Sequence, residues 1–114
     1  MDWITLVDEN QLDGIIEQSL SNAVKGVILF KHSTRCSISS MVKNRLERDW
    51  NFGTELPLYY LDLISYRNIS GKIAALFEVE HQSPQILIIK NGKCIYHASH
   101  SDISVSAIET FLNS

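Results

Sequence analysis

The sequence predicts one α/β domain built around a mixed β-sheet, and three observations support this prediction. The chain has 114 residues, which is a usual length for a single domain. Apolar residues make up 45% of it, enough for a core without disulfide support. Strand-like apolar runs alternate with segments of helical periodicity, a pattern typical of parallel strands joined by crossover helices.

The expected elements follow one another in the order β-α-β-α-β-α-β-β-α. Strands are expected at residues 3–7, 27–31, 56–63, 84–90 and 93–99. Helical spacing of apolar residues is found at 10–20, 36–50, 69–79 and 101–112. The Asn91-Gly92 pair predicts a tight type I′ turn, so the last two strands should form an antiparallel hairpin. Ser101 or Ser104 is expected to cap the final helix.

The segment from Cys36 to Trp50 is expected to be an amphipathic helix. Its buried side should carry Ile38, Met41, Val42, Leu46 and Trp50. Its solvent side should carry Lys43, Arg45, Glu47 and Arg48.

Composition argues against several classes of partner. The net charge of −3 provides no basic surface for nucleic acid or for anionic membranes. No apolar run approaches the length of a membrane span, and the first ten residues lack the basic start of a signal peptide. Two cysteines 58 positions apart do not form a secreted disulfide framework, and no zinc-ligand spacing occurs. We therefore expect a cytoplasmic protein without a bound metal.

Cys36 is the candidate nucleophile, because it lies between a buried strand and the start of a helix. Ligands of open α/β sheets bind beyond the carboxyl ends of the strands. A thiolate at a helix start is stabilised by the helix dipole and by free backbone N–H groups. Lys31, His32 and Arg35 could add positive charge, and Thr34 and Ser39 could donate hydrogen bonds. A lone intracellular cysteine is otherwise more often an inert core residue.

Pro84 is the second notable feature, because it begins a strand that otherwise reads as central. A cis Ser83-Pro84 bond would leave the Ser83 backbone free to pair with an extended substrate, as in strand addition. An ordinary trans proline at a strand start is the simpler alternative, since few X–Pro bonds are cis.

Together these features resemble the thioredoxin fold over nearly the whole chain, residues 1–114 as one domain. More narrowly, "ILFKHSTRCSIS" (28–39) and "HQSPQILIIKNGK" (81–93) resemble the YtxJ-type monothiol bacilliredoxins. These are redox proteins of the bacillithiol system, within the thioredoxin-like superfamily.

The resemblance implies a function: removal of bacillithiol, a small bacterial thiol, from S-bacillithiolated client proteins. Cys36 would attack the mixed disulfide and keep the bacillithiol, and a second bacillithiol would regenerate it. Thr34, Arg35, Ser39, Ser83 and Pro84 would contact the substrate. No bound cofactor is implied; bacillithiol acts as co-substrate, and we expect a monomer.

The residues themselves support a monothiol mechanism. Ser39 occupies the position where a dithiol protein has its resolving cysteine, and a hydroxyl cannot cut a mixed disulfide. Cys94 follows a strand that leads away from the site, and six residues at about 3.3 Å each separate them by roughly 20 Å. A disulfide needs Cα atoms within about 7 Å, so we expect Cys94 to be structural.

Two other functions remain open at this point. One is a thioredoxin-fold adaptor in which Cys36 is incidental and the Pro84 groove recognises partners. The other is an iron–sulfur carrier like the monothiol glutaredoxins. Those use Cys-Gly-Phe-Ser, whereas this chain has Cys-Ser-Ile-Ser, and the missing glycine hinders close approach of the backbone to a cluster. Glutathione in place of bacillithiol is a further alternative.

Overall fold

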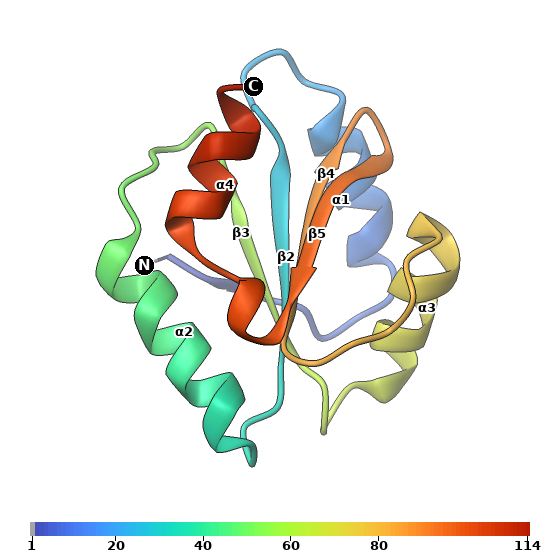
Figure 1. Ribbon diagram of the computed structural model, residues 1–114. Coiled ribbons are helices and arrows are strands. Elements are labelled where there is room, and N and C mark those ends of the chain that lie inside the picture. The colour runs from blue at the N-terminus through green and yellow to red at the C-terminus, as the bar shows by residue number, and fades with distance from the viewer. Residues whose placement is uncertain (1) are drawn as a thin grey trace.

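The computed structural model describes residues 2–114 and contains a five-stranded sheet between two layers of helices (Figure 1). The strands are β1 (Ile4–Thr5), β2 (Val27–His32), β3 (Leu58–Asp62), β4 (Gln85–Lys90) and β5 (Lys93–Ser99). The helices are α1 (Gln11–Ser19), α2 (Ser37–Asp49), α3 (Arg67–Phe77) and α4 (Val105–Leu112), with a short 3-10 turn at His100–Asp102. The predicted order of elements and the mixed sheet are confirmed.

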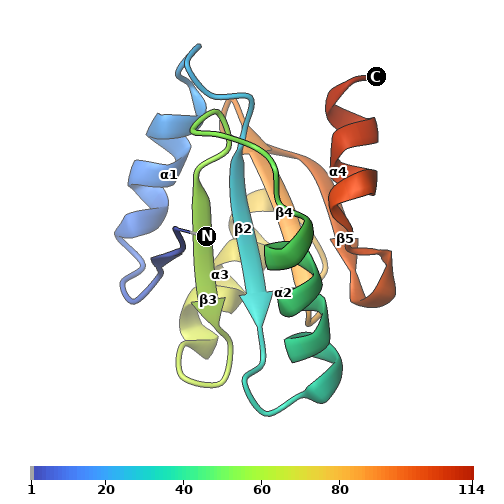
Figure 2. The same ribbon diagram turned by 90° about the vertical axis from the view of Figure 1, so that its left-hand side faces the viewer.

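The strands lie side by side in the order β1-β3-β2-β4-β5. β1, β3 and β2 are parallel, whereas β4 runs antiparallel to both β2 and β5. The register pairs His32 with Asp62 and Lys31 with Gln85. The carboxyl ends of β2 and β3 and the start of β4 therefore lie at the same end of the sheet, the lower end in Figure 2. We call this end of the strands the sheet edge.

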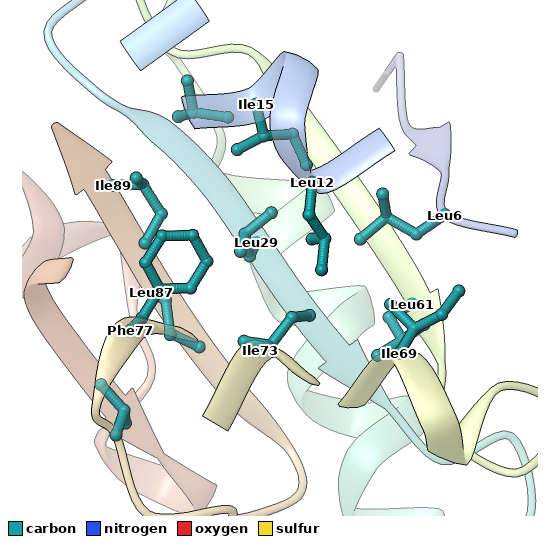
Figure 3. Packing of buried hydrophobic residues seen from close by; sticks show 12 residues of the cluster. Leu6, Leu12, Ile15, Leu29, Leu61, Ile69, Ile73, Phe77, Leu87 and Ile89 are labelled. Atoms are coloured by element: carbon teal, nitrogen blue, oxygen red, sulfur yellow. The ribbon is translucent and has the colours of Figure 1, made fainter. Parts of the chain in front are cut away.

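Side chains alternate between two apolar cores along each central strand, as the pleat requires. On one face, Leu12 and Ile15 of α1 and Ile73 and Phe77 of α3 pack with Leu29 of β2 (Figure 3). On the other face, α2 and α4 cover the sheet; the buried residues there include Phe30, Val42, Leu46, Ile86 and Ile108. The continuous apolar runs of β2 and β4 follow from burial on both faces.

The predicted burial of α2 is wrong at its first turns. Ile38 and Met41 were expected inside, yet they are 51% and 61% exposed. The reason is that α2 begins beyond the end of β2, so no strand lies beneath its first turns (Figure 2). Val42 and Leu46, farther along the helix, are buried as expected.

The polar side of α2 is also less exposed than predicted. Arg45 donates from its guanidinium to the carbonyls of Ser101 and Ile103, which ties α2 to the segment before α4. Lys43 pairs with Glu47 at 3.2 Å, and both side chains are half-buried. These long side chains cover apolar surface with their stems while keeping polar partners.

The last helix starts later than expected. The segment predicted as one helix from 101 to 112 divides into the 3-10 turn and α4. Of the two serines considered as caps, Ser104 takes the role, because its Oγ accepts from the N–H of Ala107 at 3.1 Å. An N-cap serine satisfies a backbone donor that the helix leaves free.

Candidate functional site

Cys36 lies at the N-cap position of α2, just beyond the carboxyl end of β2. Its thiol is free and half-buried, and its backbone is extended, with φ −102° and ψ 120°. The first intrahelical bond of α2 runs from the Ser40 N–H to the Cys36 carbonyl at 3.0 Å. The N–H groups of the three residues between them are therefore left for another acceptor, as at any helix start. This is a suitable environment for a thiolate.

The loop before Cys36 is held by a buried hydroxyl. The Ser39 Oγ accepts from the Ser33 N–H at 3.1 Å and lies 2.6 Å from Nδ1 of His32. Ser39 is 0% exposed. The sequence placed Ser39 in contact with substrate; in the structure its hydroxyl faces inward and fixes the turn that presents Cys36.

His32 is stacked in an aromatic cluster on the α2 side of the sheet. Its ring lies 5.9 Å from the ring of Phe30 and 5.6 Å from that of Tyr60. Burial lowers the pKa of His32, and the charge of Lys43 lowers it further, with Asp62 opposing. The imidazole is therefore neutral at pH 7, and His32 supplies a ring that positions Ser39 and no positive charge for Cys36.

Thr34 and Arg35 form the exposed tip of the loop between β2 and α2. Neither side chain has a hydrogen bond among residues 2–114. Both side chains can therefore meet a molecule that arrives next to Cys36, and their contact with substrate stays a prediction.

Ser83 and Pro84 lie at the same edge of the sheet as Cys36, because β4 begins beside the end of β2. The Ser83-Pro84 bond is cis, as considered from the sequence. Among the described residues, the Ser83 backbone makes no hydrogen bond, and its buried Oγ also has no partner. The Pro84 carbonyl, by contrast, accepts from the His100 N–H at 3.0 Å. A free main-chain donor and acceptor at a strand start can pair with an extended peptide.

Lys31 does not face Cys36, contrary to the expectation that it could stabilise the thiolate. It is 0% exposed, and its Nζ lies 3.4 Å from the Ser70 carbonyl and 3.3 Å from Nδ1 of His81. Successive strand residues point to opposite faces, so Lys31 lies on the α3 side while His32 lies on the α2 side. The sequence placed Lys31 near this edge, but Ser70, whose carbonyl and hydroxyl contact Lys31 and His81, had no signal of its own.

Cys94 lies at the opposite end of the sheet. It pairs with Ile89, which in turn pairs with Val27 at the start of β2. Its Sγ donates to the Tyr96 carbonyl at 3.3 Å, and burial raises the pKa of the thiol. These contacts agree with a structural residue that cannot reach Cys36.

Within residues 2–114, no group of three or more His, Cys, Asp or Glu side chains is arranged to hold a metal ion. Over the same residues, no helix is both long and apolar enough to span a membrane.

Comparison with known proteins agrees with this geometry. Residues 4–108 match the family model of the monothiol bacilliredoxin BrxC. A solved structure described as a candidate oxidoreductase with a thioredoxin fold is 30% identical, at a TM-score of 0.77. The match covers 97% of this chain and 93% of that one.

Thioredoxins share the fold at lower identity. The Malassezia sympodialis thioredoxin Mala s 13 is 16% identical with a TM-score of 0.72, over 98% of this chain and 89% of that chain. The oxidised thioredoxin of Plasmodium falciparum is 16% identical with a TM-score of 0.69, over 98% and 96%. A free cysteine at a helix start, a thioredoxin fold and a family match over most of the chain together support a thiol redox function. The chain belongs to the monothiol bacilliredoxin BrxC family.

Proposed function

We propose that the protein removes bacillithiol from S-bacillithiolated proteins by thiol–disulfide exchange at Cys36. The observation that carries the proposal is a free, half-buried thiol at the start of α2, on the same sheet edge as an unpaired Ser83 backbone. The other cysteine of the chain lies at the far end of the sheet. Such a site can start an exchange but cannot finish it alone.

The exchange proceeds in two displacements. The Cys36 thiolate attacks the bacillithiol sulfur of the mixed disulfide, and the client cysteine leaves as a thiolate. Bacillithiol is then bound to Cys36 through a new disulfide. A second bacillithiol thiolate attacks that disulfide, which releases Cys36 as a thiolate and forms bacillithiol disulfide. A separate reductase supplies the two electrons that return this disulfide to thiols.

The neighbouring residues have distinct roles in this proposal. The Ser83 N–H and C=O pair with the extended backbone of the client, and Pro84 sets the position of that segment. Thr34 and Arg35, exposed at the loop tip, contact the bacillithiol part. Ser39 acts indirectly, because its buried hydroxyl holds the loop that carries Cys36.

Mass spectrometry of the intact protein tests the central step. After reduction and treatment with bacillithiol disulfide, the wild type should gain one bacillithiol. Cys36→Ser should gain none, whereas Cys94→Ser, the matched control, should behave like the wild type. An adduct that persists without Cys36 would overturn the proposal.

A second assay tests the direction of transfer. A reporter protein bearing bacillithiol on its cysteine should lose it to the wild-type protein, and the same reporter bearing glutathione should lose it more slowly. Faster release of glutathione would assign the site to the other thiol.

A further inference from the structure

The ammonium group of Lys31 is buried without a counter-ion. The side chain is 0% exposed on the central strand, and its two polar contacts, at 3.3 and 3.4 Å, are both to neutral groups. Charge-assisted hydrogen bonds are usually about 2.7–2.9 Å long, so these two are weak. Neither ion pair of residues 2–114 involves Lys31.

The groups around Lys31 also remain incompletely satisfied. Gln85 is its partner in the β2–β4 register, so both side chains lie on the same face of the sheet. The Gln85 Oε1 is buried and has no hydrogen-bond partner among the described residues. Its Nε2 donates to the Glu80 carbonyl at 3.1 Å. A neutral amide oxygen could not balance the charge of Lys31 in any case.

A cavity of about 440 Å³ is lined by the two residues that Lys31 contacts. Its walls are Leu63, Arg67, Ser70, Gly71 and His81. Ser70 and His81 are the two residues that Lys31 touches, so its ammonium lies just behind the cavity wall. Arg67 adds a second cation, and it too forms no ion pair within residues 2–114.

His81 is the exposed residue of this wall whose ring contacts the Lys31 amine. Its Nδ1 accepts from Lys31 and lies 3.0 Å from the Ser70 Oγ, yet the residue is exposed. Burial and the charge of Lys31 both lower the pKa of His81, so the ring is neutral at pH 7. Exposed side chains change rotamer rapidly, so the neutral ring can turn aside and let an anion take its place on the ammonium.

We propose that this cavity, with Lys31, Arg67, Ser70 and His81, is a binding site for the carboxylate group of a small molecule. The planar fork of Arg67 matches the two oxygens of a carboxylate, and the Ser70 hydroxyl adds a donor. The bound anion supplies the counter-charge that Lys31 lacks. With its pKa lowered to about 8, the amine of Lys31 is still mostly protonated at pH 7.

Two sources can provide this carboxylate. One is a free organic acid. The other is a carboxylate on the small thiol carried by Cys36, since Leu63 and His81 belong to loops at the same sheet edge as Cys36 (Figure 2). The second source rests on the proposed exchange function, whereas the site itself does not.

Titration with succinate, followed by amide NMR shifts at pH 7 and constant ionic strength, tests the site. Saturable shifts are expected at Arg67, Ser70, Gly71 and His81. Lys31→Met should weaken binding about tenfold or more, and Arg67→Gln should weaken it in the same direction. Lys72→Met is the matched control: it removes one charge from the exposed side of α3, outside the cavity, and should leave the affinity unchanged.

Three results would overturn the proposal. The first is the absence of saturable shifts in the wild type. The second is an affinity that neither Lys31→Met nor Arg67→Gln alters in protein whose remaining spectrum is native. The third is tighter binding of inorganic phosphate than of succinate, which would refute the carboxylate class.

A kinetic comparison then identifies the source. Cys36 should displace one thiolate from dithiodipropionate, which carries carboxylates, and from hydroxyethyl disulfide, which is neutral. A Lys31→Met protein that is slower only with the first compound assigns the site to the thiol on Cys36. If the wild type binds succinate and Lys31→Met slows both reactions equally, or neither, the site is assigned to a free acid. Failure of both disulfides to react at Cys36 would refute the exchange function and leave the succinate result standing.

Discussion

At the scale of single residues, the two neighbours Lys31 and His32 show how one edge of the sheet is divided between two environments. Both are fully or almost fully buried at the end of β2, but they point to opposite faces. His32 becomes neutral in an aromatic cluster and positions the Cys36 loop through Ser39. Lys31 keeps its charge for most of the physiological pH range and contacts Ser70 and His81, two walls of a cavity on the α3 side.

Lys31 should make the stability of the protein depend on pH in the alkaline range. Burial lowers its pKa from 10.5 to about 8, so between these values the unfolded chain binds more protons than the folded one. The free energy of unfolding then rises with pH across this window, by about 3 kcal/mol for this residue. Below pH 8 the full penalty of the buried charge is present.

Urea denaturation of the wild type and Lys31→Met across this window tests the effect. The variant should be more stable at pH 7, by up to about 3 kcal/mol, and the difference should vanish toward pH 10.5. Comparing the two proteins removes the contribution of the tyrosines, whose raised pKa values act in the opposite direction. A variant that is less stable at pH 7 would show that Lys31 is paired in solution.

At the scale of elements, α2 presents Cys36 at its N-cap and carries Ser39, in place of a resolving cysteine, in its first turn. Cys36 and Ser39 are the N-cap and third residue of the helix, and residues three apart on a helix are neighbours. Their side chains differ in environment, because Cys36 is half-buried and Ser39 is fully enclosed. The helix geometry is therefore already that of a dithiol motif with one sulfur replaced.

Ser39→Cys should restore an internal resolving thiol. On oxidation, the variant should lose two hydrogens by intact mass and should release bound bacillithiol without an external thiol. Ser40→Cys, one position along and also on the first turn of α2, is the control and should not form this bond. If both variants formed the disulfide with Cys36 equally well, the helix would not favour position 39 over position 40 for a resolving cysteine.

The cap of α4 is a second local prediction. The Ser104 Oγ is the side-chain cap of this helix, so Ser104→Ala should lower the free energy of unfolding by about 1 kcal/mol. Ser106→Ala changes an exposed serine of the same helix and should have a smaller effect. Thermal unfolding of the three proteins, followed by circular dichroism, measures both changes; equal destabilisation would contradict the capping role.

At the scale of the whole molecule, the alternation of strands and helices could be read from the sequence because burial on both faces leaves long apolar runs. β2 and β4 are such strands, and the Asn91-Gly92 turn placed β5 beside β4. The exposure of Ile38 and Met41 could not be read, because periodicity does not say where a helix passes the edge of its sheet.

For the candidate site too, local sequence signals identify some residues, and tertiary packing determines the contacts of the others. Cys36 and the Ser83-Pro84 pair could be found from local signals, a strand end before a helix and a proline at a strand start. The inward role of Ser39 depends on His32, and the cavity at Lys31 depends on residues 39 and 50 positions away. Such contacts are set by the packing of α3 and of the loop before β4, which leaves no periodic trace in the sequence.

The two cysteine sulfurs lie at opposite ends of β2 and β4, and this separation also decides which disulfides the protein can form on oxidation. Six strand residues, roughly 20 Å, separate the two ends, so the chain cannot close a ring on itself. Any disulfide that the protein forms must therefore join it to a small thiol, which caps it, or to a second protein molecule, which cross-links it. Capping is independent of protein concentration and cross-linking is not, so dilution alone should shift the product from cross-linked pairs to capped monomers.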